Sequence, residues 1–192
     1  NPDTLGQEIK IGRRGSITGH LSVEGTQGHV AYQHLADNPM PRLVKLLDAL
    51  CKHSFDEGNE FFPATNLEVT TIDVGNAATN VIPNAGKASF NVRYNDEWTK
   101  DSISQELQKI LDSVGEAYAL ELEGDAQSFI TKPGGWSEAV RDAVQEVTGC
   151  TPEYTTNGGT SDARFVSQYC PVIECGGVNA SIHQIDENAR VE

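Results

Sequence analysis

The chain has 192 residues, of which 38% are hydrophobic and 22% are charged, and its formal net charge at pH 7 is -14. This length fits one ordinary domain or two small ones, and the hydrophobic content supports a core, which argues against disorder. The negative charge argues against nucleic acid and membranes as partners, because both attract a basic protein face.

The first half of the chain shows three strand patterns and one helix pattern. Apolar and polar residues alternate from Ile17 to Val23, which predicts a half-buried strand. Leucines at helical spacing predict an amphipathic helix over residues 41–53, with a proline in its first turn. Residues 66–74 are rich in Val, Thr and Ile, and residues 87–94 alternate, so each segment predicts a strand.

A second helix and a fourth strand complete this pattern. The apolar residues between Ile103 and Val114 recur at helical spacing, and residues 118–122 alternate again. The order β-α-β-β-α-β is typical of ferredoxin-like folds, in which two helices cover one face of an antiparallel sheet. We therefore predict an α+β domain over residues 15–126, whose sheet edge favours a homodimer.

The pattern changes after Gln127, where strand and helix signals alternate in the α/β manner. One helix signal ends at Gly149, and a glycine turn, a helix over residues 161–168 and a short apolar segment follow. At about 65 residues, this region is too small to form a doubly wound sheet of its own. We predict that residues 127–192 belong to a larger α/β layer structure, with residues 1–14 as the end of an earlier segment.

The cysteines and the N-terminal residues bear on the compartment. Cys51, Cys150, Cys170 and Cys175 show neither C-x-x-C spacing nor a dense framework, which predicts reduced and mostly buried thiols. The first residues lack the basic and apolar regions of a secretory signal. The apolar runs stay short of the roughly 20 residues that span a bilayer. We therefore expect a cytoplasmic protein.

The segment Gly158-Gly159-Thr160-Ser161-Asp162 is the most specific local signal for ligand binding. Consecutive glycines let the backbone approach a ligand closely, and a helix that begins at Thr160 or Ser161 directs free N–H groups at an anion. The alternative is an ordinary glycine turn that leads into a helix N-cap. The residues of this turn favour binding of an anionic ligand, and the ordinary turn with an N-cap remains the alternative.

Two histidines carry weaker signals. His183 follows a glycine-containing segment near the end of the chain and is a candidate metal ligand. Zinc needs three or four protein ligands, or fewer per ion in a bridged two-metal site, so one histidine is not sufficient. His29 follows the first predicted strand and is a candidate for stabilising an oxyanion. A solvated loop histidine is the alternative.

Three further polar positions also have ordinary alternatives. Asn80 lies in a turn, where its amide either serves turn chemistry or binds a substrate carboxylate. Arg93 lies on the polar face of its strand, and a solvated arginine is the simpler interpretation. Arg13, which stands with Arg14 between two glycines, is equally well explained as part of a flexible basic pair.

A series of blocks through almost the whole chain resembles the two-zinc deacylases and peptidases, in particular those that remove a succinyl group from diaminopimelate. So many matched blocks in order are a stronger signal than any single motif. The blocks are Gly12-Arg13-Arg14-Gly15-Ser16, Gly28-His29-Val30-Ala31-Tyr32, Asn59-Glu60-Phe61-Phe62-Pro63, Asn80-Val81-Ile82-Pro83, Phe90-Asn91-Val92-Arg93-Tyr94, Thr131-Lys132-Pro133-Gly134, Gly158-Gly159-Thr160-Ser161-Asp162 and Ser181-Ile182-His183.

The resemblance implies a zinc-binding catalytic domain that is interrupted by an inserted dimerisation domain. Residues 15–126 match the insertion, and residues 1–14 and 127–192 match parts of the catalytic domain. The implied reaction is hydrolysis of N-succinyl-LL-2,6-diaminopimelate to succinate and LL-diaminopimelate, in bacterial lysine and cell-wall precursor synthesis. Two zinc ions per site are implied, with cobalt as a substitute.

The resemblance also implies roles for single residues. His183 is the metal ligand, and His29 reaches into the site of the partner subunit to polarise the amide oxygen. The carboxylates and the amine of the small anionic substrate are held by Arg13, Asn80, Arg93, Gly159, Thr160 and Asn179. Arginine suits a dicarboxylate because the guanidinium binds a carboxylate with two parallel hydrogen bonds.

The chain departs from the family pattern in two ways. Gln33, Asn157 and Ala163 replace a proline and two glycines, which affects local loop geometry. The remaining zinc ligands and the catalytic glutamate are missing, so we expect a fragment of a longer enzyme that is inactive alone. Two alternatives stay open: a related deacylase that acts on acetylornithine or a dipeptide, and a dimerisation module without catalysis.

Overall fold

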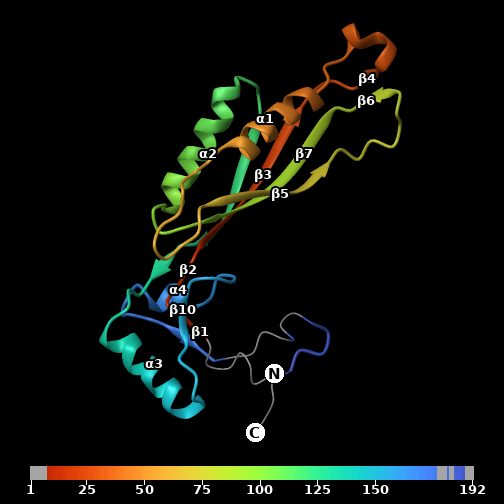
Figure 1. Ribbon diagram of the computed structural model, residues 1–192. Coiled ribbons are helices and arrows are strands. Elements are labelled where there is room, and N and C mark those ends of the chain that lie inside the picture. Colours follow the sequence, from red (N-terminus) through yellow and green to blue (C-terminus); the bar gives the residue numbers. More distant parts are fainter. Residues whose placement is uncertain (1–7, 177–180, 182–183, 189–192) are drawn as a thin grey trace. The chain divides into compact units, whose positions relative to one another are not determined.

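The computed structural model describes residues 8–176, 181 and 184–188 of the chain (Figure 1). The chain divides into two compact units, which are described separately below. The larger unit is Gly15–Gln127, and the smaller unit combines Asn1–Arg14 with Ser128–Glu192. Among the described residues, the helices are all too short or too polar to cross a membrane.

The larger unit contains a four-stranded antiparallel sheet with two helices. The strands lie in the order β5 (Asn66–Asp73), β7 (Ala85–Tyr94), β3 (Gly15–Glu24) and β8 (Ala119–Ala126). Figure 1 shows the helices α1 (Met40–Lys52) and α2 (Lys100–Val114) side by side on one face of this sheet. The chain order β3-α1-β5-β7-α2-β8 confirms the predicted ferredoxin-like arrangement.

The ends of the two helices follow from local sequence. Pro41 stands in the first turn of α1, where its missing N–H has no helical partner to lose. Thr99 caps α2: its side chain accepts from the Ser102 N–H, and the Ser102 hydroxyl accepts from the Thr99 N–H. Gly115 ends α2 with φ of 73°, a left-handed conformation that glycine adopts without strain.

The core of this unit lies between the sheet and the helices. Every second residue of β3 and β7 is buried, so one face of each strand meets the helices and the other carries polar side chains. Helix α1 contributes its leucine stripe and α2 contributes isoleucines and leucines. The buried cluster comprises Ile17, Leu21, Val23, Leu43, Leu46, Leu47, Leu50, Ala88, Phe90, Val92, Tyr94, Ile103, Leu107, Ile110 and Leu111.

Two glycines of β3 make room for aromatic rings on β7. Gly19 pairs with Phe90 and Gly15 pairs with Tyr94 across the strands. A Cβ atom on Gly19 would lie 2.2 Å from the Phe90 ring, and one on Gly15 would lie 2.2 Å from the Tyr94 ring. The rings therefore occupy the space that side chains on β3 would need. The Tyr94 hydroxyl then donates to the Ala126 carbonyl at 2.9 Å, which ties β7 to the end of β8.

The end of the larger unit at the β4–β6 pair carries short elements that the sequence patterns did not predict. Strand β4 (Gly28–His29) pairs antiparallel with β6 (Val81–Ile82), and the 3-10 helix η1 (Val30–Leu35) follows β4 directly. Figure 1 shows these elements beyond the ends of β3 and β7. We call β4, η1 and β6 the tip of the unit.

Asp56 organises the connection between α1 and β5. Its Oδ1 accepts from the Gly58 N–H, the Thr65 N–H and the Asn95 side-chain amide, and its Oδ2 accepts from the Trp98 indole at 2.8 Å. Burial raises the pKa of Asp56, but hydrogen bonds from Thr65, Trp98 and Gly58 outweigh it and leave the pKa below its ordinary value of 3.8. The ionised carboxylate thus links this connection to the segment before α2 through hydrogen bonds.

Replacing Asp56 with Asn is expected to destabilise the protein by about 1–3 kcal/mol at pH 7. The neutral amide oxygen is a weaker acceptor than the charged carboxylate, and the amide N–H group faces one of the donors that the carboxylate accepted from. A lowered folded-state pKa gives stability that is present above the unfolded pKa and lost as pH falls through the folded pKa. The stability difference between Asp56→Asn and the native protein should therefore be constant above about pH 5 and shrink below about pH 4. Urea denaturation at several pH values measures this. Glu57→Gln, a change at the exposed neighbouring residue, is the control, and a pH-independent difference for Asp56→Asn would contradict the prediction.

The smaller unit is built on a mixed three-stranded sheet. Strand β1 (Glu8–Lys10) lies between β10 (Glu153–Thr155), to which it is parallel, and β11 (Glu174–Cys175), to which it is antiparallel. Strand β2 (Gly12–Arg13) pairs with β9 (Phe129–Ile130). The helices are α3 (Gly135–Thr148), which Gly149 ends, and α4 (Ala163–Val166).

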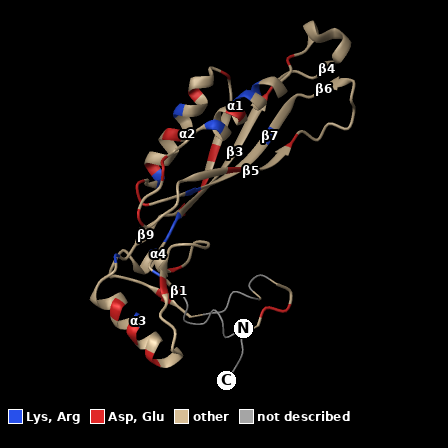
Figure 2. Ribbon diagram, in the orientation of Figure 1, with Lys and Arg blue, Asp and Glu red and all other residues tan. Residues whose placement is uncertain are grey.

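The acidic residues of the chain are spread over both units. They lie on α2 of the larger unit, on α3 of the smaller unit and in the loops (Figure 2), which fits a role of the negative charge in solubility.

Two predictions about this region and the cysteines were wrong. The helix expected over residues 161–168 has only four residues, Ala163–Val166, so Thr160 and Ser161 precede it and do not form its first turn. All four cysteines are exposed, not buried. In α1 the leucine stripe takes the buried face, which leaves Cys51 on the solvent side of the helix.

Candidate functional site

The structure brings two of the predicted site residues together at the tip of the larger unit. The β4–β6 register pairs His29 with Val81, the residue after Asn80. The backbone N–H of Val30 donates to the Asn80 carbonyl at 3.1 Å. Both His29 and Asn80 are exposed. Residues 51 positions apart in the sequence are thus neighbours at one exposed end of the unit.

The backbone fixes which nitrogen of His29 carries a proton. The Ala31 N–H donates to His29 Nδ1 at 3.1 Å, so Nδ1 is an acceptor and caps the start of η1. A neutral imidazole with an accepting Nδ1 carries its proton on Nε2. His29 therefore presents an Nε2–H donor at an exposed position. A donor of this kind is what an amide oxygen needs when it gains negative charge during hydrolysis.

Arg93 lies elsewhere in the same unit. It stands near the end of β7 on the polar face of the sheet, with Asn91 on the same face. Eight residue-to-residue steps along the extended strand separate it from Ala85 at the start of β7, which amounts to about 26 Å. Within the larger unit, Arg93 and the tip are therefore not parts of one pocket.

In the smaller unit, Arg13 lies beside the glycine turn. Its Nε donates to Glu174 Oε2 at 2.8 Å, its Nη2 contacts the same oxygen, and its Nη1 donates to the Asn157 carbonyl at 2.7 Å. The Ser161 hydroxyl contacts the other Glu174 oxygen, Oε1. We call Arg13, Glu174 and the turn 157–161 the arginine cluster.

The glycine at position 158 is required by this arrangement. Its φ is 95°, and a Cβ atom there would lie 2.3 Å from Arg13 Nη1. Gly159 and Thr160, the two predicted ligands of the turn, are exposed. The structure therefore brings Arg13, Gly159 and Thr160 to one place, although these positions lie at opposite ends of the sequence.

Sequence reasoning missed Glu174 as a member of this cluster, and it named Ser161 in the glycine turn without assigning it a partner. The signal was present: Glu174 is a single carboxylate inside the apolar run Val172-Ile173-Glu174-Cys175. A partly buried carboxylate in such a run needs a positive or hydrogen-bonding partner. The identity of that partner is a long-range property, and the local sequence does not give it.

Two predicted site residues, Asn179 and His183, lie outside the described residues. Among the residues that the structure does describe, no three His, Cys, Asp or Glu side chains gather in a way that could hold a metal ion. Zinc needs three or four protein ligands in an ordinary site. The described part of the chain thus does not fit a resident metal by itself.

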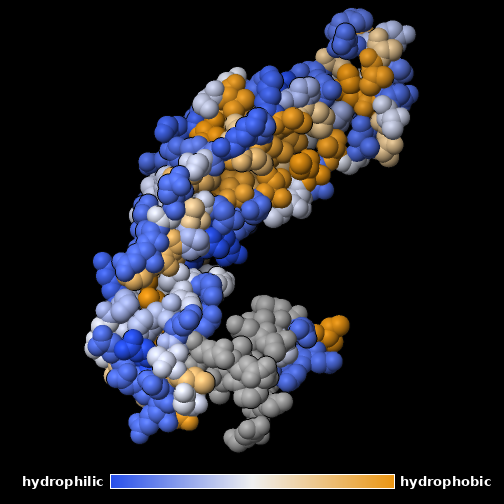
Figure 3. Space-filling model, viewed as in Figure 1, coloured by the Kyte–Doolittle hydropathy of each residue, from blue (hydrophilic) through white to orange (hydrophobic). Residues whose placement is uncertain are grey.

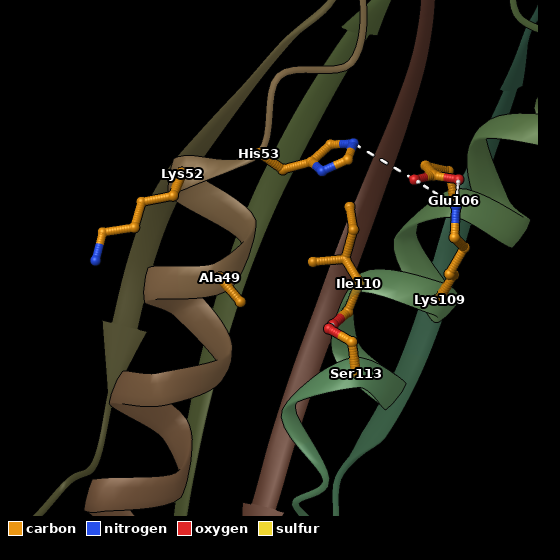
Figure 4. Close-up of a pocket in the computed structure, with 7 residues that line it drawn as sticks. All are labelled: Ala49, Lys52, His53, Glu106, Lys109, Ile110 and Ser113. Atoms are coloured by element: carbon orange, nitrogen blue, oxygen red, sulfur yellow. Dashed lines mark hydrogen bonds and ion pairs between the residues drawn. The ribbon is translucent and has the colours of Figure 1, made fainter.

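A pocket of about 410 Å³ lies between α1 and α2, and none of the predicted site residues is among the residues that line it. Figure 4 shows its lining, in which His53 Nε2 faces Glu106 Oε1 at 3.5 Å and Lys109 pairs with the same carboxylate. These side chains satisfy one another on an open surface. We therefore do not assign the candidate site to this pocket.

The two-helix, four-stranded unit with its tip defines a ferredoxin-like α+β domain. The sequence pattern of the peptidase dimerisation domain family matches residues 11–119. The chain belongs to this family.

The chain is similar to enzymes described as succinyl-diaminopimelate desuccinylase. It is 51% identical to those of Parvibaculum lavamentivorans and Xanthobacter autotrophicus, over 98% and 100% of this chain and 49% and 52% of the relatives. The chain therefore spans about half the length of the curated relatives it matches.

Solved structures confirm the fold. Aminopeptidase PepT from Bacillus cereus matches 88% of this chain and 45% of its own, with a TM-score of 0.69 and 15% identity. An M20 family metallo-carboxypeptidase from Sulfolobus solfataricus matches 84% of this chain and 49% of its own, with a TM-score of 0.70 and 16% identity. At such identities the likeness concerns the fold alone.

Proposed function

We propose that this chain is part of a metal-dependent desuccinylase that hydrolyses N-succinyl-LL-2,6-diaminopimelate to succinate and LL-diaminopimelate. The observation that carries the proposal is the 51% identity, along essentially the whole chain, to relatives described as succinyl-diaminopimelate desuccinylase. In this proposal residues 15–126 form the dimerisation domain, and residues 1–14 and 127–192 belong to the catalytic domain.

Residues of this chain contribute substrate contacts in this proposal. His29 donates from Nε2 to the amide oxygen, which gains negative charge as water adds to the carbonyl carbon. Asn80, its neighbour at the tip, offers an amide to a substrate carboxylate or amine. Arg13, Arg93, Gly159, Thr160 and Asn179 hold the remaining polar groups, and the arginines suit carboxylates because of their planar fork of donors.

The proposed metal is zinc, two ions per site, with cobalt as a substitute. His183 is the ligand that this chain contributes. The described residues do not complete a metal site, so the other ligands come from outside them.

An apolar stripe on α3 supports a catalytic domain larger than the smaller unit. Trp136 is 57% exposed and Val147 is 85% exposed, although both lie on the apolar side of an amphipathic helix. Exposed apolar stripes of this kind are typical of surfaces that another segment covers. We propose that the rest of the catalytic domain packs on this stripe.

The proposed homodimer forms through the dimerisation domain. Strand β5 lies at one edge of the sheet, so its outer backbone groups are available for pairing. Ile72 on β5 is 59% exposed and Val44 on α1 is 65% exposed. Figure 3 shows hydrophobic side chains gathered near α1 and the adjoining strands. An edge strand beside exposed apolar residues favours a second copy of the same surface as the partner.

The test uses the full-length enzyme that contains this chain. With zinc present, we expect hydrolysis of the succinylated substrate with a kcat/KM at least about 100-fold higher than for the acetylated analogue, because the analogue leaves carboxylate-binding groups unpaired. A chelator should abolish turnover, and added zinc should restore it. Equal rates with both substrates would point to a different deacylase, and metal-independent turnover would refute the proposal.

A further inference from the structure

Glu174 lies at the centre of the arginine cluster and joins three segments of the smaller unit. Its Oε2 accepts from Arg13 on β2, and its Oε1 accepts from Ser161 after the glycine turn. Arg13 in turn donates to the Asn157 carbonyl. The carboxylate thus holds both the guanidinium and the turn, from a position 161 residues away from Arg13.

Arg13 has donors beyond those used in this cluster. Its guanidinium carries five N–H groups in a fixed plane. The three hydrogen bonds to Glu174 and Asn157 use the Nε side of the plane and one N–H of Nη1. Among the described residues, one N–H on each terminal nitrogen therefore remains. The remaining N–H of Nη2 points away from the Nε side, along the outer edge of the plane, where a guanidinium can bind a carboxylate.

The surroundings keep the guanidinium in this orientation. The Arg13 side chain is 16% exposed and that of Glu174 is 25% exposed, so both charges are largely shielded from water. A Cβ at position 158 would collide with Nη1, so the glycine turn lies directly against the guanidinium. An arginine held in this way loses little further freedom when it binds a ligand, which is how preorganisation improves affinity.

We propose that Glu174 is a positioning residue that orients the Arg13 guanidinium and the turn 157–161 to receive a carboxylate group of the substrate. This inference rests on the proposed function and deepens it, because it assigns a supporting role to a residue outside the substrate-binding set. Glu174 does not touch the substrate. It acts through Arg13 and through Ser161.

The test measures steady-state kinetics of the full-length enzyme with the succinylated substrate. We expect Glu174→Gln to raise KM about tenfold, the scale of one charge-assisted hydrogen bond, with kcat changed less than about twofold. Glu174→Asp, which keeps the charge, should recover part of the loss. In an Arg13→Ala background, Glu174→Gln should have little further effect on KM, because the group that it orients is gone.

Asp142→Asn, at an exposed carboxylate on α3, is the matched control and should leave KM and kcat unchanged. Thermal unfolding of every variant separates positioning from folding. A Glu174→Gln enzyme with native KM overturns the proposal, and so does a KM increase that is equally large without Arg13.

Calorimetric binding of succinate to the same variants gives a second readout. If the native enzyme binds succinate about tenfold more tightly than Glu174→Gln but does not turn over the substrate, the proposed reaction fails while the positioning role stands. If a native enzyme without turnover does not bind succinate either, both fail.

Discussion

Replacing His29 with Asn is expected to lower kcat of the full-length enzyme by about 10²–10³-fold, the usual cost of losing one donor to a developing oxyanion. The side-chain amide of Asn can occupy the place of Nδ1, so it can still accept from the Ala31 N–H and cap η1. It does not reach the place of Nε2. The variant therefore keeps the local fold and loses only the exposed donor.

Replacing His29 with Gln tests the opposite case, in which the exposed donor is kept and the cap of η1 is lost. Its longer side chain places the amide N–H near the position of Nε2, so we expect Gln to retain more activity than Asn, although it lacks the cap to Ala31. His34→Asn is the control, because His34 lies on η1, the 3-10 helix that His29 caps, and is exposed. Steady-state rates decide between these outcomes. Equal losses for Asn and Gln would show that His29 does not act through Nε2.

The second large effect concerns the pairing of Gly19 with Phe90. Gly19→Ala is expected to destabilise the larger unit by about 1–3 kcal/mol, because the new methyl group overlaps a ring that is fully buried. Phe90→Ala removes the ring and should cost about 3–5 kcal/mol through lost contacts and a cavity. Combining Gly19→Ala with Phe90→Leu should cost less than the sum of the single changes, since a leucine leaves the ring space open.

Fluorescence of Trp98 during urea unfolding measures these changes. Trp98 packs against the core of the larger unit, and the other tryptophan, Trp136, belongs to the smaller unit and can be replaced by Phe. Gly135→Ala is the control: the space around Gly135 is open, so the Trp98 transition should stay in place. A Gly19→Ala protein as stable as the native one would contradict the packing argument.

The sequence predicted the larger elements because their residues repeat with a clear period. The leucines of α1 recur at helical spacing, and prediction placed this helix within one residue of its observed bounds, Met40–Lys52. The alternation along β3 and β7 predicted the buried and polar faces in the same way. The tip was missed because its strands have two residues each, which is too short to show any period.

The candidate site shows the same division. Sequence analysis selected His29, Asn80 and Arg13 by residue type and resemblance, and their roles in binding and catalysis stay predictions. It did not place His29 beside Asn80, and it did not assign Glu174 to Arg13. Both contacts join residues that are distant in the chain, so no local pattern encodes them.

The amino-acid order by itself determined the ferredoxin-like element order and the faces of the helices and strands, since burial of apolar residues follows a local period. The tertiary structure alone decided which polar groups meet. It placed the Ala31 N–H of η1 against His29 Nδ1, and it brought Glu174 to Arg13. Hydrogen bonds of this kind depend on where the folded backbone brings distant segments together, and that is a property of packing, not of local sequence.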